Sequence, residues 1–62
     1  MKMARIKKGW DNEGLPGLVL GPPIMVGQLW TPILWLTDVD PDFFKTAGLE
    51  FYEASDGEEN TI

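Results

Sequence analysis

Short apolar runs alternate with turn-forming clusters along the chain, and apolar positions often recur at every second residue. In the first run, Ala4 and Ile6 are apolar while Arg5 between them is basic, which predicts a strand with one buried face. No segment has a convincing helical pattern. We expect five strands, over residues 3–10, 15–20, 24–26, 29–37 and 48–53.

Glycine and proline separate these runs from one another. The Gly-Pro-Pro sequence at 21–23 must end or bend a strand, because proline donates no hydrogen bond to a strand ladder. Gly27 marks a bulge or a bend. Pro32 lies inside the most β-like run, and it favours an edge position or a bulge for that strand. Residues 44–47 fit one 3-10 turn before the last strand.

These elements predict an all-β protein with a single domain. Five short strands at close spacing fit a small barrel or a sandwich, and closure into a barrel would leave no exposed strand edge. We assign residues 1–53 to this domain and residues 54–62 to an acidic C-terminal tail. The chain has 62 residues and no cysteine, so docking on a partner or oligomerisation would be a common means of stabilising it.

The order of these elements resembles the SH3-like barrel superfamily. In that fold a 3-10 turn separates strands four and five, and residues 44–47 occupy the corresponding place. The first part of the chain also resembles the KOW motif of ribosomal and transcription-elongation proteins. The resemblance lies in the spacing of Gly9, Gly14, Gly17 and the apolar Val19. It implies an SH3-like barrel of about five strands, and the KOW-like part implies contact with RNA or a ribosome.

Related families add an expectation about partners. The whole-chain architecture is similar to the small SH3-like proteins that dock on larger assemblies, such as the SH3-like component of photosystem I. Signalling SH3 domains carry an Ala-Leu-Tyr-Asp-Tyr segment, and plasmid-type dihydrofolate reductases carry a Val-Gln-Ile-Tyr segment. Neither segment occurs in this chain.

Charge is distributed unevenly along the chain, whose formal net charge is −5. Residues 1–8 are basic and residues 38–62 are strongly acidic. If the two parts lie on neighbouring strands, their charges neutralise each other. A second interpretation is two separate patches for two partners. A further hypothesis is an acidic surface that mimics nucleic acid and blocks a nucleic-acid-binding protein. The residues of that surface would be Asp38, Asp40, Asp42, Glu50, Glu53, Asp56, Glu58 and Glu59.

Catalysis and metal binding have little support in the sequence. The chain has no histidine and no cysteine, and Ser55 has no base beside it. Residues 38–42 (DVDPD) resemble the start of a calcium loop, but Phe43 and Leu49 stand where such a loop needs glycine and glutamate. We therefore expect a solvated acidic turn, no cofactor and no enzymatic activity.

Membrane insertion and secretion are not expected either. Prolines interrupt the apolar stretch 15–36, and no apolar core of a signal peptide follows the basic N-terminus. The lack of cysteine fits a cytoplasmic protein, or a protein within a virus particle if the chain is a phage structural protein.

Aromatic residues are the strongest candidates for a binding surface. Three tryptophans are more than so small a core can easily hide. We expect Trp35 in the core and Trp30, beside Pro32, on the surface, since tryptophan is enriched at interface hot spots. Adjacent residues of an extended segment point in opposite directions, so one of Phe43 and Phe44 should be buried and the other partly exposed.

The sequence thus predicts a non-enzymatic protein-binding module, a small accessory or structural subunit that docks on a larger protein assembly. Its partner would be a protein, a larger assembly or a second copy of the chain. Nucleic acid is not favoured as a partner, because the net charge is negative. The alternatives are the acidic inhibitor and the KOW-like RNA or ribosome contact. The predicted partner-binding residues are Trp30, Phe43, Phe44, Pro22 and Pro23.

Overall fold

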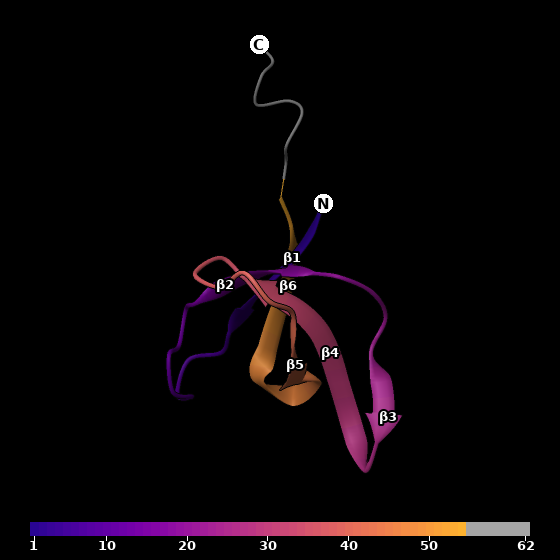
Figure 1. The fold of residues 1–62 in the computed structure, drawn as a ribbon. Coiled ribbons are helices and arrows are strands. Elements are labelled where there is room, and N and C mark those ends of the chain that lie inside the picture. Colours follow the sequence, from indigo (N-terminus) through magenta and orange to yellow (C-terminus); the bar gives the residue numbers. More distant parts are fainter. Residues whose placement is uncertain (55–62) are drawn as a thin grey trace.

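A computed structural model describes residues 1–54, which form one curled antiparallel sheet of six strands with a single 3-10 turn (Figure 1). The predicted all-β class is confirmed, although the described residues contain six strands and not five. The elements are β1 (Lys2–Ile6), β2 (Pro16–Val19), β3 (Ile24–Val26), β4 (Gln28–Trp35), β5 (Asp42–Lys45), η1 (Thr46–Gly48) and β6 (Leu49–Glu53). The predicted acidic tail, from residue 55 onward, lies outside the described residues.

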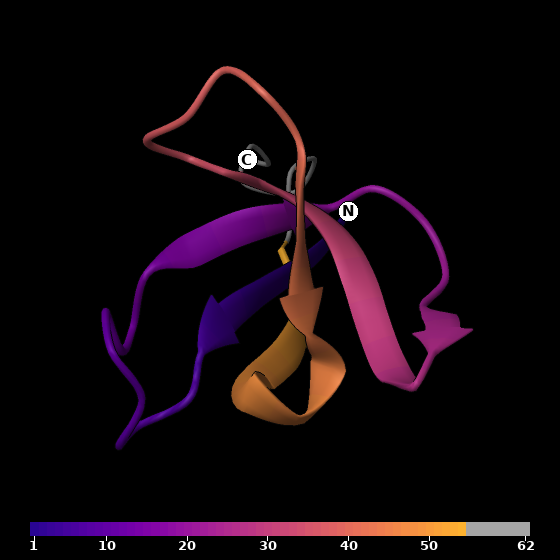
Figure 2. The ribbon, with the colours of Figure 1, turned by 60° about the horizontal axis from the view of Figure 1, so that its bottom comes forward.

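The sheet does not close into a barrel. Its strand order is β3-β4-β2-β1-β6, with β5 paired to β4 beside this path. Within residues 1–54, β3 and β6 therefore each pair with one neighbour, and the expectation of a closed barrel without edges is wrong. The reason lies in η1, which carries the chain directly from the flank of β4 to the flank of β1, so that β5 and β6 share no ladder (Figure 2).

Strand β4 is the centre of the sheet, because three other strands pair with it. Residues 28–30 pair with β3, residues 33–35 pair with β2, and residues 30–33 pair with β5 on the opposite side. Its sequence explains this position. Thr31, Ile33 and Trp35 are buried at every second residue, which gives β4 one continuous face toward the core.

Pro32 therefore lies in the central strand, and the expected edge position is wrong. The lack of an N–H is tolerated for a local reason. The carbonyl of Pro32 accepts a hydrogen bond from the N–H of Leu20 at 3.0 Å. Within one residue of an antiparallel strand the nitrogen and the carbonyl face the same side. The nitrogen of Pro32 therefore also faces this side, where the chain turns away at residues 21–23. On that side the pairing with β3 has ended at Trp30 and the pairing with β2 begins at Ile33, so the ladder needs no donor at Pro32.

The core is small and centred on β1, β4 and β6. The predicted inward positions Ala4 and Ile6 are buried, and Trp35 is 5% exposed, so these three predictions are confirmed. Ile33 is fully buried against Gly17 of β2, where an added Cβ would lie 2.7 Å from Ile33 Cγ1. The buried apolar side chains are Met3, Ala4, Ile6, Ile33, Trp35 and Leu49.

The segment around the two phenylalanines differs from its prediction. Phe43 and Phe44 belong to β5, and the 3-10 turn covers Thr46–Gly48 in place of residues 44–47. β5 begins at Asp42, the last residue of the Asp-Pro-Asp sequence, and its pairing with β4 holds these four residues in a strand. As expected for an extended segment, Phe43 is 52% exposed while Phe44 packs against the core.

Opposite charges meet across β1 and β6, as the sequence predicted. The register pairs Arg5 with Glu50, and Arg5 Nε lies 3.1 Å from Glu50 Oε1. The amino group of Met1 lies 3.4 Å from Glu53 Oε1. Both pairs are well exposed, so each stabilises the fold only slightly.

Residues 1–54 contain no helix long or apolar enough to cross a membrane.

Substitution of Gly17 by alanine is expected to lower the free energy of unfolding by about 1–3 kcal/mol, the usual cost of overpacking a core. The new methyl would lie within 3.0 Å of both Ile33 and Trp35, which are 0% and 5% exposed. Urea unfolding measures the change. Gly21→Ala is the matched control, because its nearest neighbour would be Pro32 Cγ at 3.9 Å, an ordinary contact. Equal midpoints for the two variants would contradict this description of the core.

The hydrogen-bonded hydroxyl pair of Thr31 and Thr46, with 2.7 Å between the two Oγ1 atoms, generates a second prediction. Thr46→Val is expected to cost about 1–3 kcal/mol, because it leaves the fully buried Thr31 hydroxyl without a partner. Thr31→Val should cost less, since Thr46 is only half-buried and water can replace the partner that its hydroxyl loses. The double variant should be more stable than Thr46→Val alone, and a thermal-unfolding double-mutant cycle would reveal the opposite order.

Candidate functional site

An aromatic hollow of about 320 Å³ opens on the surface between the β1–β2 loop, β4 and β5. Its wall is largely made of indole and phenyl rings that come from three separate parts of the chain. The residues that line this aromatic hollow are Trp10, Asp11, Asn12, Trp30, Phe43, Phe44 and Lys45.

The β1–β2 loop holds Trp10 in place through backbone geometry. Gly9, Asn12 and Gly14 have φ of +94°, +61° and +85°, a left-handed conformation that glycine and asparagine adopt most readily. The Gly9 N–H donates to Glu13 Oε1 at 2.8 Å, and the Gly14 N–H donates to the Ile6 carbonyl at 2.7 Å. A loop closed by these bonds presents Trp10 at a defined position.

Close packing of aromatic rings fixes the floor of the hollow. The ring centroids of Trp10 and Phe44 are 5.8 Å apart, and those of Trp35 and Phe44 are 5.3 Å apart in an edge-to-face arrangement. Both separations lie in the favourable range for aromatic pairs. The Trp10 indole also lies over Gly48, where an added Cβ would come within 2.8 Å of the ring. Phe44 therefore connects the hollow to the core through Trp35.

Trp30 forms the wall next to the β3–β4 hairpin. Its indole N–H donates to the Val26 carbonyl at 3.0 Å, so the polar atom of the ring is satisfied within the hairpin. Gly27, with φ of +74°, makes the turn between the two strands. The hairpin projects beyond the rest of the sheet (Figure 1). Its exposed apolar side chains are Ile24, Met25, Val26 and Leu29.

The charges at this hollow are few and of opposite sign. Asp11 and Lys45 contribute one carboxylate and one ammonium to the lining. Asp42 lies nearby in the chain, but its carboxylate is occupied, since Oδ1 accepts from the Phe43 N–H at 2.8 Å and Oδ2 lies 3.5 Å from Trp35 Nε1. The lining of the hollow therefore combines four aromatic residues with the polar side chains of Asp11, Asn12 and Lys45.

The predicted partner-binding residues fall into two groups. The aromatic hollow brings together Trp30, Phe43 and Phe44. Pro22 and Pro23 lie apart from them and line a second depression, of about 500 Å³, which we call the proline hollow. The residues that line the proline hollow are Lys2, Val19, Leu20, Gly21, Pro22, Pro23, Thr31, Thr46 and Phe51. The two hollows share no lining residue.

Trp10 was not among the predicted partner-binding residues, although it lines the aromatic hollow. The sequence offered one signal, a large aromatic residue directly after a glycine in a turn-rich loop. Its position over Gly48 could not be predicted, because it depends on the β1–β6 pairing that brings the two segments together. The Lys7 N–H donates to the Gly48 carbonyl at 2.8 Å and fixes this approach.

The acidic residues of the nucleic-acid mimic considered above are only partly placed. Glu50 and Glu53 lie in ion pairs on β6, so positive groups offset their charges. Asp38 and Asp40 are exposed in the β4–β5 loop. Asp56, Glu58 and Glu59 lie outside the described residues, as does Ser55. Across residues 1–54 no three histidine, cysteine or acidic side chains are grouped closely enough to hold a metal ion.

Comparison with protein-family models, with curated proteins and with solved structures found no match to this chain.

Gly48→Ala is expected to displace the Trp10 indole with little loss of stability. Its Cβ would meet three atoms of that ring at 2.8–2.9 Å, and Trp10 is exposed enough to move aside. In a two-dimensional NMR spectrum the Trp10 indole N–H signal should shift strongly, whereas the Trp30 signal should stay, because its bond to Val26 is unaffected. An unchanged Trp10 signal would show that the ring does not rest on Gly48.

Proposed function

We propose that this chain is a non-enzymatic protein-binding module, a small accessory or structural subunit that docks on a larger protein assembly. A phage particle is one such assembly. The observation that carries the proposal is the aromatic hollow, in which Trp10, Trp30, Phe43 and Phe44 line one depression. Tryptophan and other large aromatic residues are the side chains that most often dominate protein interfaces, because they bury much area with few rotatable bonds.

The β3–β4 hairpin extends this surface with further apolar side chains. Trp30 lines the hollow and pairs directly with Ile24 across the hairpin, while Met25 next to it is 68% exposed. No charged residue occurs between Glu13 and Asp38 in the sequence, so the hairpin can be covered without burying an ion. Exposed apolar area of this kind is typical of protein interaction sites.

The chemistry of the hollow favours a partner with an apolar or aromatic side chain as its anchor. Such a side chain would fill the depression between Trp10, Trp30 and Phe43, while Asp11 and Lys45, which also line it, would meet polar groups of the partner. Charged groups at the rim of an interface contribute more to the orientation and the association rate of the partner than to its affinity. The interface would thus have an apolar centre and a polar rim.

Phe43→Ala is expected to weaken docking by about 2 kcal/mol, or about thirtyfold in Kd, as for a hot-spot aromatic residue. Phe43 is 52% exposed, so its removal should leave the fold intact. Trp30→Ala should weaken docking at least as much, and Trp30→Phe should retain part of it. The full chain, immobilised through a tag, would be used to capture its partner from a lysate of the source organism, and binding of each variant would then be titrated.

Val39→Ala is the matched control, because Val39 is 92% exposed and does not line either hollow. Equal affinity of the Phe43 and Val39 variants would refute the assignment of the aromatic hollow. Capture should also survive nuclease treatment. Recovery that nuclease abolishes would favour the KOW-like contact with RNA or a ribosome. Recovery of a nucleic-acid-binding protein that excess DNA and salt displace would favour the acidic mimic.

A further inference from the structure

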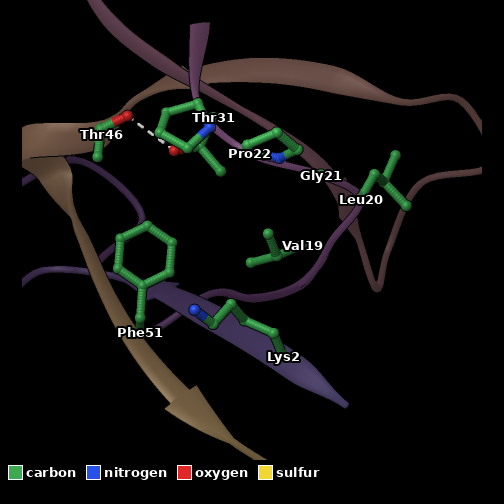
Figure 3. A pocket seen from close by; sticks show the side chains of 9 residues that line it. Lys2, Val19, Leu20, Gly21, Pro22, Thr31, Thr46 and Phe51 are labelled. Carbon is green, nitrogen blue, oxygen red and sulfur yellow. Dashed lines mark hydrogen bonds between the residues drawn. The ribbon is translucent and has the colours of Figure 1, made fainter.

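The proline hollow has the size and the apolar wall of a small-molecule site. Its volume of about 500 Å³ lies within the common range for such sites, roughly 300–1,000 Å³. Leu20 and Phe51 line it with side chains that are 46% and 43% exposed, respectively. Figure 3 shows Val19, Leu20, Pro22 and Phe51 arranged around one open space. An apolar ligand would remove these side chains from water.

The wall formed by residues 20–23 is held in place without a ligand. The Leu20 N–H donates to the Pro32 carbonyl at 3.0 Å, which ties the start of the segment to the central strand. Pro22 and Pro23 follow, and the proline ring fixes the backbone angle φ of both residues. A site with a fixed wall loses little conformational entropy when it is occupied.

Lys2 supplies the one charged side chain among the lining residues. In Figure 3 its ammonium nitrogen lies inside the hollow near Phe51, and the distance from Nζ to the ring centroid is 5.8 Å. Glu53 stands directly opposite Lys2 in the β1–β6 ladder, but its Oε1 binds the Met1 amino group. Within residues 1–54, Lys2 forms no ion pair, because Glu53 pairs with the Met1 amino group and Glu50 pairs with Arg5.

The threonine pair adds two hydroxyl groups to the lining of the same hollow. Thr31 is fully buried, and its Oγ1 lies 2.7 Å from Thr46 Oγ1 in a hydrogen bond that either hydroxyl can donate. Thr46 is half-buried and is therefore the more accessible of the two residues. The hollow thus combines an apolar wall with an ammonium group and hydroxyl groups, and none of its lining residues is acidic.

From this combination we propose that the proline hollow is a binding site for a small monocarboxylate with an alkyl or aryl body. The apolar body lies against Leu20, Pro22 and Phe51, and the carboxylate meets the Lys2 ammonium. A neutral ligand of the same shape lacks the charge-assisted bond, and an amine would meet a like charge. This site does not depend on the docking surface, because the two hollows have no residue in common.

Octanoate is the probe, with 1-octanol as its uncharged counterpart, and each is titrated into the full chain while amide and methyl NMR signals are followed. Octanoate should give saturable shifts at Leu20, Thr46 and Phe51. Octanol should bind about tenfold more weakly or worse, because it lacks the charged partner of Lys2. Octanoate shifts that centre on Trp10 and Phe43, or that do not saturate, would overturn the proposal, as would equal binding of the two probes.

Lys2→Met keeps the length of the apolar side chain and removes the charge. This variant should bind octanoate about tenfold more weakly than the parent and should bind octanol unchanged. Lys45→Met is the matched control, since it removes the same charge from the aromatic hollow and should leave octanoate binding unaltered. If both variants weaken octanoate binding equally, the effect reports net charge and the site assignment is wrong.

Discussion

The packing of Ile33 against the bare backbone of Gly17 is the contact on which the rest of this small fold depends. It allows β2 and β4 to approach so closely that a single methyl group at position 17 would collide with the core. Ile33 and Trp35 then complete the interior with residues of β1 and β6. Because β4 also pairs with β3 and β5, any displacement of Ile33 would move the strand that positions both hollows. A core of so few side chains has no second layer to compensate.

The small core also explains why so much apolar surface stays uncovered. With a curled sheet of short strands, only one face of each strand can be buried, and the side chains on other faces remain in contact with water. Along β4, Thr31, Ile33 and Trp35 are buried in the interior, whereas Trp30 on the other face is only half-buried. The charge-free segment between Glu13 and Asp38 includes the β3–β4 hairpin and the wall of the proline hollow. Exposed apolar area here therefore follows from the fold and is available for binding.

Much of the fold could be predicted, because local patterns determine it. The alternation around Ala4 and Ile6 predicts β1, and the opposite charges of Arg5 and Glu50 anticipate the β1–β6 pairing. The expectations that were wrong concern features that depend on contacts between segments distant in the sequence. β5 forms because it pairs with β4. Pro32 is tolerated in the central strand because the neighbouring segment turns away after Leu20, so that no hydrogen-bond donor is needed at Pro32. The sequence pointed to Trp30, Phe43 and Phe44 as candidates, but their grouping with Trp10 in one hollow depends on the contact between Trp10 and Gly48, which no local pattern shows.

The two hollows are separated by the alternation of β4 itself. Trp30 and Thr31 are neighbours in the chain and project from opposite faces of the strand, so one lines the aromatic hollow while the other closes the proline hollow. Each hollow also has its own charges, Asp11 and Lys45 at the first and Lys2 at the second. A protein bound over Trp30 and Phe43 would not have to displace any residue that lines the other site. One central strand therefore contributes to both hollows, and the proposed docking surface and the proposed small-molecule site use different residues of it.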